Sequence, residues 1–200
     1  MEASRAAGWQ PIDVVRACLA GGARFVQLRA KPLGSAAFLE LAAAAAALTH
    51  DAGGQLIVND RADVAALAGA DGVHVGQDDL APADVRRLVG GERIVGLSTH
   101  TAAQLERAVD EPVSYVAIGP VFGSVTKDTS YDAVGLAMVR TAAAIAARRG
   151  LPVVAIGGIT LERAPSVLAA GAASVAVIGD LVAGGDPERR VREYVRTLGV

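Results

Sequence analysis

The stretches Leu56-Ile57-Val58-Asn59-Asp60 and Gly72-Val73-His74-Val75-Gly76-Gln77-Asp78-Asp79 each join a short apolar run to a polar tail. Apolarity that is nearly continuous, rather than alternating, is typical of strands in a parallel sheet covered on both faces. The same kind of run, rich in Val, Ile and Leu, recurs along the chain at 25–28, 56–58, 72–75, 94–97, 115–118, 153–156 and 175–178. We therefore expect these runs to form buried parallel strands.

Helical spacing fills the intervals between these runs, at 35–52, 82–89, 101–109, 136–149 and 161–170. Glycines stand where a helix end requires a left-handed residue, at Gly21, Gly53, Gly69, Gly90, Gly150 and Gly171. Asp186-Pro187 combines a capping side chain with a proline suited to the first helical turn, which predicts a last helix over 187–198. Strands and helices thus alternate along the chain.

Two architectures accept this alternation, an open doubly wound sheet and a closed (β/α)8 barrel. Polar residues follow nearly every apolar run instead of gathering after one, and a ring of strand ends would make them converge, which favours the barrel. Residues 1–10 contain no apolar run that resembles a strand. We expect an α/β protein with a single (β/α)8 TIM barrel domain over 1–200, whose first strand is either missing or a poor substitute at 4–9.

Composition excludes several classes of protein. Apolar residues make up 52% of the chain and the formal charge is −2, so disorder and nucleic-acid binding are both unlikely. The single cysteine, Cys18, cannot form an internal disulfide, and no signal-peptide pattern opens the chain. The apolar run at 41–48 is too short for a bilayer of about 30 Å. We expect a cytoplasmic protein without a membrane partner, and the sequence leaves a homo-oligomer open.

Two carboxylates follow neighbouring apolar runs, Asp60 after 56–58 and Asp79 after 72–75. Such a pair suits Mg²⁺, which takes one or two protein oxygens together with the oxygens of a phosphate substrate. Either residue alone could equally cap the following helix. The pair together favours a magnesium site, whereas no Cys/His cluster has the spacing of a zinc site.

Basic residues provide a second candidate feature. Arg29 and Lys31, two residues apart after the first apolar run, can point the same way in an extended segment. A guanidinium grips phosphate oxygens bidentately and an ammonium acts as a point charge, which suits a diphosphate. Lys127 lies in a hydroxyl-bearing segment without helical periodicity, a loop that could close over a substrate. Each of the three alone would be an ordinary surface charge.

Glycine-rich segments end the last two apolar runs, at Gly157-Gly158 and at Gly179. Phosphate-binding barrels use backbone N–H groups and a helix N-terminus in this region to hold a monophosphate. The alternative is that glycine merely permits a tight turn. Asp180 adds a negative charge there, which counts against a tight phosphate site. His74 could face a ligand or be a hydrogen-bonded core residue, and no Ser-His-Asp arrangement is readable.

Six ordered motifs carry a resemblance to a known family. They are Val26-Gln27-Leu28-Arg29-Ala30-Lys31, Leu56-Ile57-Val58-Asn59-Asp60, Gly72-Val73-His74-Val75-Gly76-Gln77-Asp78-Asp79-Leu80, Gly96-Leu97-Ser98-Thr99-His100-Thr101, Tyr115-Val116-Ala117-Ile118-Gly119-Pro120-Val121-Phe122 with Thr126-Lys127, and Ala155-Ile156-Gly157-Gly158-Ile159. From about Asp13 onward the chain closely resembles the thiamine phosphate synthase family of (β/α)8 enzymes. That family also contains a thiazole tautomerase branch with the same fold.

The resemblance implies a transferase that joins 4-amino-2-methyl-5-hydroxymethylpyrimidine diphosphate to 4-methyl-5-(2-phosphoethyl)thiazole, giving thiamine monophosphate and diphosphate. It also implies a dissociative reaction, in which diphosphate leaves first and the thiazole nitrogen captures a pyrimidinylmethyl cation. Its implied site residues are Asp60 and Asp79 for Mg²⁺; Arg29, Lys31, Asn59, Ser98 and Lys127 for the diphosphate; Gln27 and His74 near the pyrimidine; and Ser124, Thr126, Gly158, Ile178 and Gly179 for the thiazole phosphate. Among them, Arg29, Lys31, Ser98 and Lys127 are the expected catalytic residues.

Three departures from the family pattern qualify this expectation: the first strand looks absent, Ser124 stands where threonine is common, and Gly179-Asp180 replaces a usual Ser-Ala. Two alternatives therefore remain. A thiazole tautomerase-like isomerase would need an acid/base group near the thiazole, and the retained carboxylates and cations argue against it. A non-catalytic thiamine-precursor binding protein is the other, suggested by the defective first strand.

Overall fold

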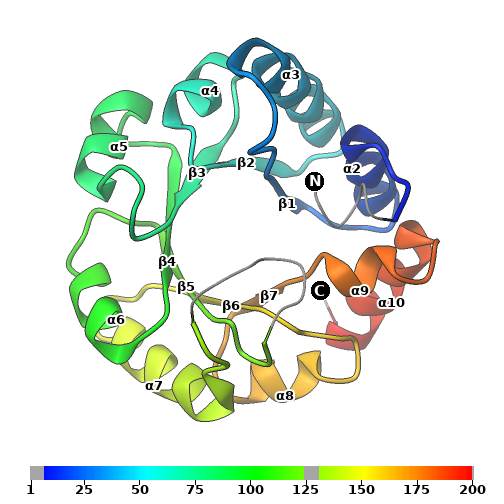
Figure 1. The fold of residues 1–200 in the computed structure, drawn as a ribbon. Helices are drawn as coiled ribbons and strands as arrows, with labels where there is room; N and C mark the ends of the chain where they lie inside the picture. Colours follow the sequence, from blue (N-terminus) through cyan, green and yellow to red (C-terminus); the bar gives the residue numbers. More distant parts are fainter. Residues whose placement is uncertain (1–6, 124–130, 200) are drawn as a thin grey trace.

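The computed structural model describes residues 7–123 and 131–199 (Figure 1). Within them a parallel sheet of seven strands runs in chain order, each strand pairing with the next one along the sequence. The strands are β1 Phe25–Leu28, β2 Gln55–Asn59, β3 Gly72–Val75, β4 Ile94–Thr99, β5 Tyr115–Ile118, β6 Val153–Ile156 and β7 Ser174–Ala176. Apart from small shifts in their bounds, these are the strands that the apolar runs predict.

Helices form an outer layer around the curled sheet (Figure 1). Their bounds are α2 Pro11–Ala20, α3 Ser35–Asp51, α4 Ala62–Leu67, α5 Pro82–Val89, α6 Ala102–Ala108, α7 Gly135–Ala147, α8 Ala164–Ala169, α9 Gly179–Val182 and α10 Pro187–Leu198. The expected strand at 175–178 is wrong at its end, because β7 stops at Ala176 and α9 begins at Gly179. Leu181 and Val182 are buried, so the helical turn places two apolar side chains in the core.

The ring of strands stays open between β1 and β7, since no ladder joins these two strands among the described residues. No strand precedes α2 at residues 7–10 either. This agrees with a barrel whose first strand is degenerate or missing; residues 4–6 of the expected substitute lie outside the described part of the chain. Phe25 at the start of β1 is 48% exposed, as expected beside an open edge.

The main core lies between the sheet and the helices. Val58, Val73, Val95 and Val116, one from each of four adjacent strands, are completely buried there. Burying a side chain of this size stabilises a fold by about 1.5–3 kcal/mol. The alanine-rich helix α3 packs against this layer through small buried side chains such as Ala42 and Ala45. The carboxyl ends of the strands are thereby held on a rigid frame.

One predicted helix stop has a different cause from the one expected. Gly21 is not left-handed (φ −73°), and Gly22 takes that conformation instead (φ 107°). A side chain at Gly21 would lie 2.6 Å from the carbonyl oxygen of Glu188 and 2.7 Å from Val191 Cβ. Glycine at 21 therefore lets α10 approach α2. Asp186 caps α10 as predicted, accepting a hydrogen bond from the backbone N–H of Arg189 at 2.9 Å.

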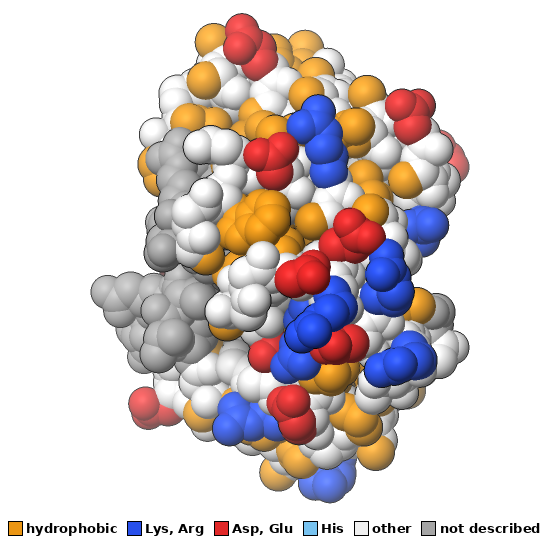
Figure 2. Space-filling view, turned by 90° about the vertical axis from the view of Figure 1, so that its right-hand side faces the viewer, with side chains coloured by type: hydrophobic (Ala, Val, Ile, Leu, Met, Phe, Trp, Pro, Cys, Tyr) orange, Lys and Arg blue, Asp and Glu red, His pale blue; other side chains and the backbone are white. Residues whose placement is uncertain are grey.

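The side of the molecule that shows α2 and α10 mixes acidic and basic side chains (Figure 2). On α10 the charges pair along the helix, as in Arg192–Glu188 at 2.6 Å and Arg189–Glu193 at 3.6 Å. Exposed pairs of this kind add only about 0.3–0.5 kcal/mol each. In the part of the chain that the structure describes, no helix is long and apolar enough to span a membrane.

Candidate active site

Strand register places four residues at one level of the barrel interior. Asn59 pairs with His74, His74 with Gly96, and Gly96 with Tyr115. The Tyr115 ring reaches across Gly96 and stacks on the His74 ring, with centroids 5.4 Å apart. A side chain at position 96 would lie 2.5 Å from His74 Nδ1 and closer still to the Tyr115 ring. The glycine therefore provides the space that brings Tyr115 and His74 together.

A chain of hydrogen bonds leads from this pair toward the mouth of the barrel. Tyr115 Oη lies 2.8 Å from His74 Nδ1, and His74 Nε2 lies 2.7 Å from Ser98 Oγ. Burial raises the pKa of Tyr115, while a hydrogen bond from Gln27 acts in the opposite direction. The direction of one bond fixes the other, because a neutral imidazole has one N–H and one acceptor nitrogen. When Tyr115 donates to Nδ1, Nε2–H donates to Ser98; in the other tautomer, Nδ1–H donates to Tyr115 and Ser98 donates to Nε2.

The two predicted metal carboxylates are neighbours. Asp60 forms an ion pair with Lys31 Nζ at 2.8 Å, and Asp79 accepts a hydrogen bond from the backbone N–H of Gly76 at 2.8 Å. Burial raises the pKa of Asp60; Lys31 opposes that rise, and the charge and hydrogen bonding of Asp79 reinforce it. Asp60 also adopts a left-handed backbone (φ 65°), which is uncommon outside glycine.

The structure brings these groups together around a cavity of about 40 Å³. Its lining consists of Arg29, Lys31, Asn59, Asp60, His74, Gly76, Asp79 and Ser98. All of these except Gly76 are residues that the sequence predicts for the site. Gln27, which is exposed on β1, reaches the same cluster through its hydrogen bond to Tyr115. The roles assigned to these residues remain predictions.

The residues predicted for the thiazole phosphate do not line this cavity. Gly158 follows β6, Ile178 and Gly179 follow β7, and Ile178 is 38% exposed. Ser124, Thr126 and Lys127 lie outside the described residues. The described residues therefore bring together those predicted for the diphosphate, apart from Lys127, while β6 and β7 lie across the ring from β2 and β3 (Figure 1).

Gly157 and Gly158 have a packing role that sequence reasoning missed. The segments after β5 and β6 are joined by backbone hydrogen bonds, from Val121 N to Ile156 O at 2.9 Å and from Phe122 N to Gly157 O at 3.0 Å. A side chain at Gly157 would lie 2.5 Å from Pro120, and one at Gly158 would overlap the carbonyl of Gly123. Glycine is thus required for close approach of two backbones, which goes beyond a tight turn.

The negative charge that Asp180 adds at this end of the barrel has a cationic partner, Arg190. The Asp180 carboxylate accepts hydrogen bonds from Arg190, from the Tyr194 hydroxyl and from the backbone N–H of Leu161. Sequence reasoning missed Arg190 and Tyr194, since the charged face of α10 resembles that of any exposed amphipathic helix. Asp180 and Arg190 are ten residues apart and lie on different helices, so neither helical nor strand periodicity predicts that they pair.

A larger cavity, of about 460 Å³, lies between α2 and the start of α10. It contains none of the predicted site residues, and its charged groups serve local structure. Arg16 pairs with Asp13 at 3.2 Å, Asp186 caps α10, and Glu188 pairs with Arg192. Chemistry therefore favours the small polar cavity as the site, although it is much the smaller of the two.

The acidic pair fits a magnesium ion. Mg²⁺ prefers carboxylate oxygens and keeps several positions for water and substrate phosphate, so two protein carboxylates suffice. Asp60 and Asp79 both line the small cavity, so their carboxylates are near enough to share one ion. Among the described residues no group of three or more His, Cys, Asp or Glu side chains could hold a metal, so the two carboxylates would rely on other oxygens, such as those of water and phosphate, to complete the coordination.

Residues 3–181 match the model of a family described as thiamine monophosphate synthase. The chain belongs to this family. A thiamine-phosphate synthase of Roseiflexus sp. (strain RS-1) is 47% identical over 189 residues, which cover 94% of this chain and 79% of that protein. The thiamine-phosphate synthase of Moorella thermoacetica is 40% identical over 191 residues, covering 94% of this chain and 90% of the relative.

Solved structures agree with the family assignment. A thiamine phosphate pyrophosphorylase from Pyrococcus furiosus superposes with a TM-score of 0.85 at 27% identity, covering 95% of this chain and 90% of the other. The predicted barrel fold is thereby confirmed. Family membership also confirms the predicted transferase of thiamine biosynthesis.

Proposed function

We propose that this chain joins 4-amino-2-methyl-5-hydroxymethylpyrimidine diphosphate to 4-methyl-5-(2-phosphoethyl)thiazole, forming thiamine monophosphate and releasing diphosphate at the 40 Å³ cavity. The observation that carries this proposal is the convergence of Arg29 and Lys31 with Asp60 and Asp79 around one cavity at the strand ends. Basic side chains bind the phosphate oxygens, and a pair of carboxylates binds the metal ion that accompanies a diphosphate.

Departure of diphosphate builds up negative charge on the leaving oxygens. Fixed positive charge and hydrogen-bond donors, arranged before the reaction begins, stabilise such charge most effectively. Arg29 is suited to grip two oxygens at once, and Lys31 is held in place by Asp60 at 2.8 Å. The Ser98 hydroxyl, which is hydrogen-bonded to His74 at 2.7 Å, adds a neutral polar group beside them. These three groups lower the barrier to breaking the C–O bond.

Asp60 and Asp79 would hold Mg²⁺ through the oxygens that remain after their bonds to Lys31 and Gly76. The ion, when bound, supplies positive charge that neutralises the diphosphate. Asn59, which is 8% exposed, lies beside Asp60 and offers an amide donor to the same phosphates.

Attack by the thiazole nitrogen on the pyrimidinylmethyl cation forms a C–N bond without loss of a proton. No general base is therefore needed, which accords with a His74 ring that is engaged with Tyr115 and Ser98. Water would compete for the cation, so a sheltered site is required. Ser124 and Thr126, together with backbone at Gly158, Ile178 and Gly179, are the proposed partners of the thiazole substrate, and Lys127 is a proposed partner of the diphosphate.

Incubating the purified protein with both substrates and Mg²⁺, and measuring thiamine monophosphate, tests this proposal. We expect product from the wild type, loss of product on chelation of Mg²⁺, and a fall of about 10²-fold or more in Asp60→Ala. Asp63→Ala is the matched control, because Asp63 is an exposed carboxylate paired with Arg61 outside the cavity. Circular dichroism shows whether each variant is folded.

Other outcomes would support the alternatives. Tight binding of either precursor without turnover would indicate a non-catalytic binding protein. Isomerisation of a thiazole substrate in the absence of the pyrimidine diphosphate would indicate the tautomerase branch. Equal activity in Asp60→Ala and Asp63→Ala would show that the reaction does not take place at this cavity.

A further inference from the structure

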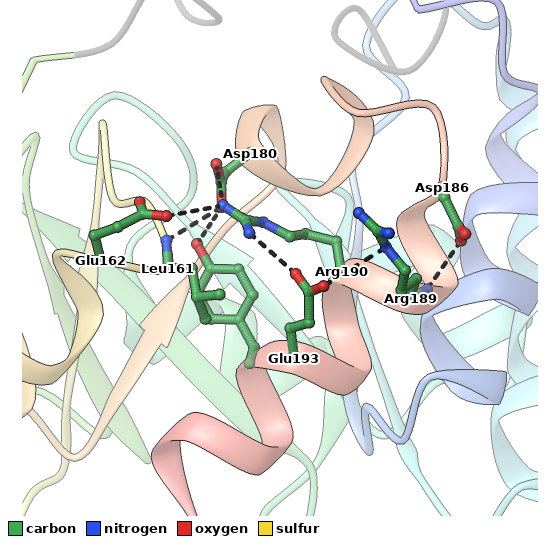
Figure 3. Close-up of polar contacts among 8 residues, drawn as sticks. Leu161, Glu162, Asp180, Asp186, Arg189, Arg190 and Glu193 are labelled. Carbon is green, nitrogen blue, oxygen red and sulfur yellow. Dashed lines mark hydrogen bonds and ion pairs between the residues drawn. The ribbon is translucent and has the colours of Figure 1, made fainter.

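The carboxylate of Asp180 joins segments of the chain that are distant in sequence (Figure 3). Arg190 binds it with two nitrogens, Nε at 3.0 Å and Nη2 at 3.1 Å. Tyr194 Oη donates to it at 2.7 Å, and the backbone N–H of Leu161 donates at 3.2 Å. The side chain of Asp180 is only 16% exposed, so these bonds form in a partly desolvated place where they are stronger than in water.

The position of this network links two glycine-rich strand ends. Asp180 follows Gly179 at the start of α9, directly after β7. Leu161 belongs to the segment after β6, three residues beyond Gly158. The bond between Asp180 and Leu161 N therefore holds the Gly158 and Gly179 backbones at a fixed separation, and α10 braces both through Arg190 and Tyr194.

Charge balance in the network depends on Arg190. Burial on its own raises the pKa of Asp180, but hydrogen bonds from Arg190 and Tyr194 outweigh burial and lower it, so the group is ionised at neutral pH. Glu162 at 3.5 Å and Glu193 at 3.1 Å also face the Arg190 guanidinium. Without Arg190, Asp180 and Glu162 would lose the cation that they share beside the strand ends where a phosphate is proposed to bind, while Glu193 would keep Arg189 as a partner at 3.6 Å.

We propose that Asp180, Arg190 and Tyr194 act as positioning residues for the phosphate of the thiazole substrate, an inference that rests on the proposed function. Asp180 fixes the spacing of the two glycine-rich backbones, and Arg190 cancels the negative charge that this bracing brings near the phosphate.

Steady-state kinetics of Arg190→Met test this role. Methionine keeps much of the apolar volume of arginine and removes its charge. We expect the KM for the thiazole phosphate to rise about tenfold, with kcat and the KM for the pyrimidine diphosphate changed less than about twofold. Arg192→Met is the matched control. It also removes an arginine from α10 and deprives an acidic partner, Glu188, of its ion pair, but Arg192 is not part of the network at the strand ends. A folded Arg190→Met with an unchanged KM, or with both KM values raised equally, would overturn the inference.

Two further variants separate charge from folding. The double variant Asp180→Asn/Arg190→Met removes both charges and keeps a side-chain oxygen that can accept from Leu161 N, so its KM for the thiazole phosphate should be lower than that of Arg190→Met; a value as high or higher would refute charge compensation. Tyr194→Phe removes only the hydroxyl that donates to Asp180, and this variant tests the network if Arg190→Met does not fold. We expect a rise of about threefold in the same KM, and no rise would count against Tyr194 as a positioning residue.

Calorimetric titration with the thiazole phosphate alone measures its binding affinity, and therefore tests the inference without turnover. Weaker binding by Arg190→Met than by Arg192→Met supports it even if no product forms, whereas equal binding contradicts it. Failure of the wild type and of Arg192→Met to make thiamine monophosphate would instead contradict the proposed function.

Discussion

At the scale of single residues, the absence of a side chain at Gly96 determines how the barrel interior is filled. Tyr115 crosses the position to reach His74, and His74 orients Ser98. The position lies inside β4, where glycine would otherwise weaken a strand. A substitution there acts on stability and on the site at once.

Gly96→Ala is therefore expected to destabilise the protein by roughly 1–3 kcal/mol, as overpacking does, because the new methyl group meets His74 Nδ1 at 2.5 Å. Displacement of Tyr115 should also reduce synthase activity. Urea unfolding measures the first effect and product formation the second. Gly91→Ala provides the comparison, since nothing lies within 4 Å of a methyl group there. Equal stability of the two variants would refute the packing argument.

Cys18 illustrates how burial controls reactivity. It is 8% exposed on α2, and burial raises its pKa to about 11. The thiolate is the nucleophile, so the thiol should not react with an aromatic disulfide reagent at pH 8 in the folded protein. We expect release of one equivalent of the coloured thiol only after denaturant is added. Rapid reaction of the native protein would show that α2 opens readily.

At the scale of elements, the ends of β6 and β7 and the helix α10 form one unit through Asp180. Asp180 has a lowered pKa in the folded state because hydrogen bonds, chiefly from Arg190, outweigh the effect of burial. Stabilisation from such a group is present above the unfolded pKa and is lost as pH falls through the folded one. The unfolded value is close to 3.8.

Comparing wild type with Asp180→Asn across pH should reveal this contribution. We expect the wild type to be more stable near pH 7, and the difference in unfolding free energy to shrink as pH falls below about 3.8. Urea unfolding followed by the fluorescence of Trp9, the single tryptophan, measures it. The same scan with Asp78→Asn, which changes an exposed carboxylate, sets the baseline. A difference that stays constant with pH would exclude ionised Asp180 as its source.

At the scale of the whole molecule, the open ring leaves β1 and β7 as edge strands. Among the described residues β1 pairs only with β2 and β7 only with β6, so alternate backbone groups on their outer sides lack a strand partner. The central strands are buried on both sides, as in the fully buried β3 and β5.

Hydrogen exchange should follow this gradient. We expect amides of β3, β4 and β5 to exchange only through global unfolding, and those of β1 and β7 to exchange faster through local opening. Mass spectrometry of peptides from each strand measures the difference. Protection of β1 and β7 equal to that of β4 would indicate that the ring is closed in solution.

The sequence predicts the repeating part of this structure well. Buried parallel strands show as continuous apolar runs, and the polar residues after them, such as Asn59 and Asp79, predict the end of the barrel at which the polar cavity lies. The pairings that depend on tertiary contact are not readable in advance. Tyr115 looks like a strand former, Arg190 like a solvated helix charge, and Gly21 like a helix stop, because each depends on a partner far away in the sequence.

Asp60 combines a left-handed backbone with a carboxylate whose pKa burial raises, and Asp79 raises it further. The backbone alone costs about 1 kcal/mol relative to glycine, and a raised pKa means that folding disfavours the ionised group at neutral pH. Asp60→Gly should therefore melt at a higher temperature than the wild type under metal-free conditions while losing synthase activity. Loss of this proposed metal ligand would then raise thermal stability and reduce the proposed catalysis, so selection for heat resistance alone would favour replacement of Asp60. A lower melting temperature would show instead that the Lys31–Asp60 pair outweighs both costs.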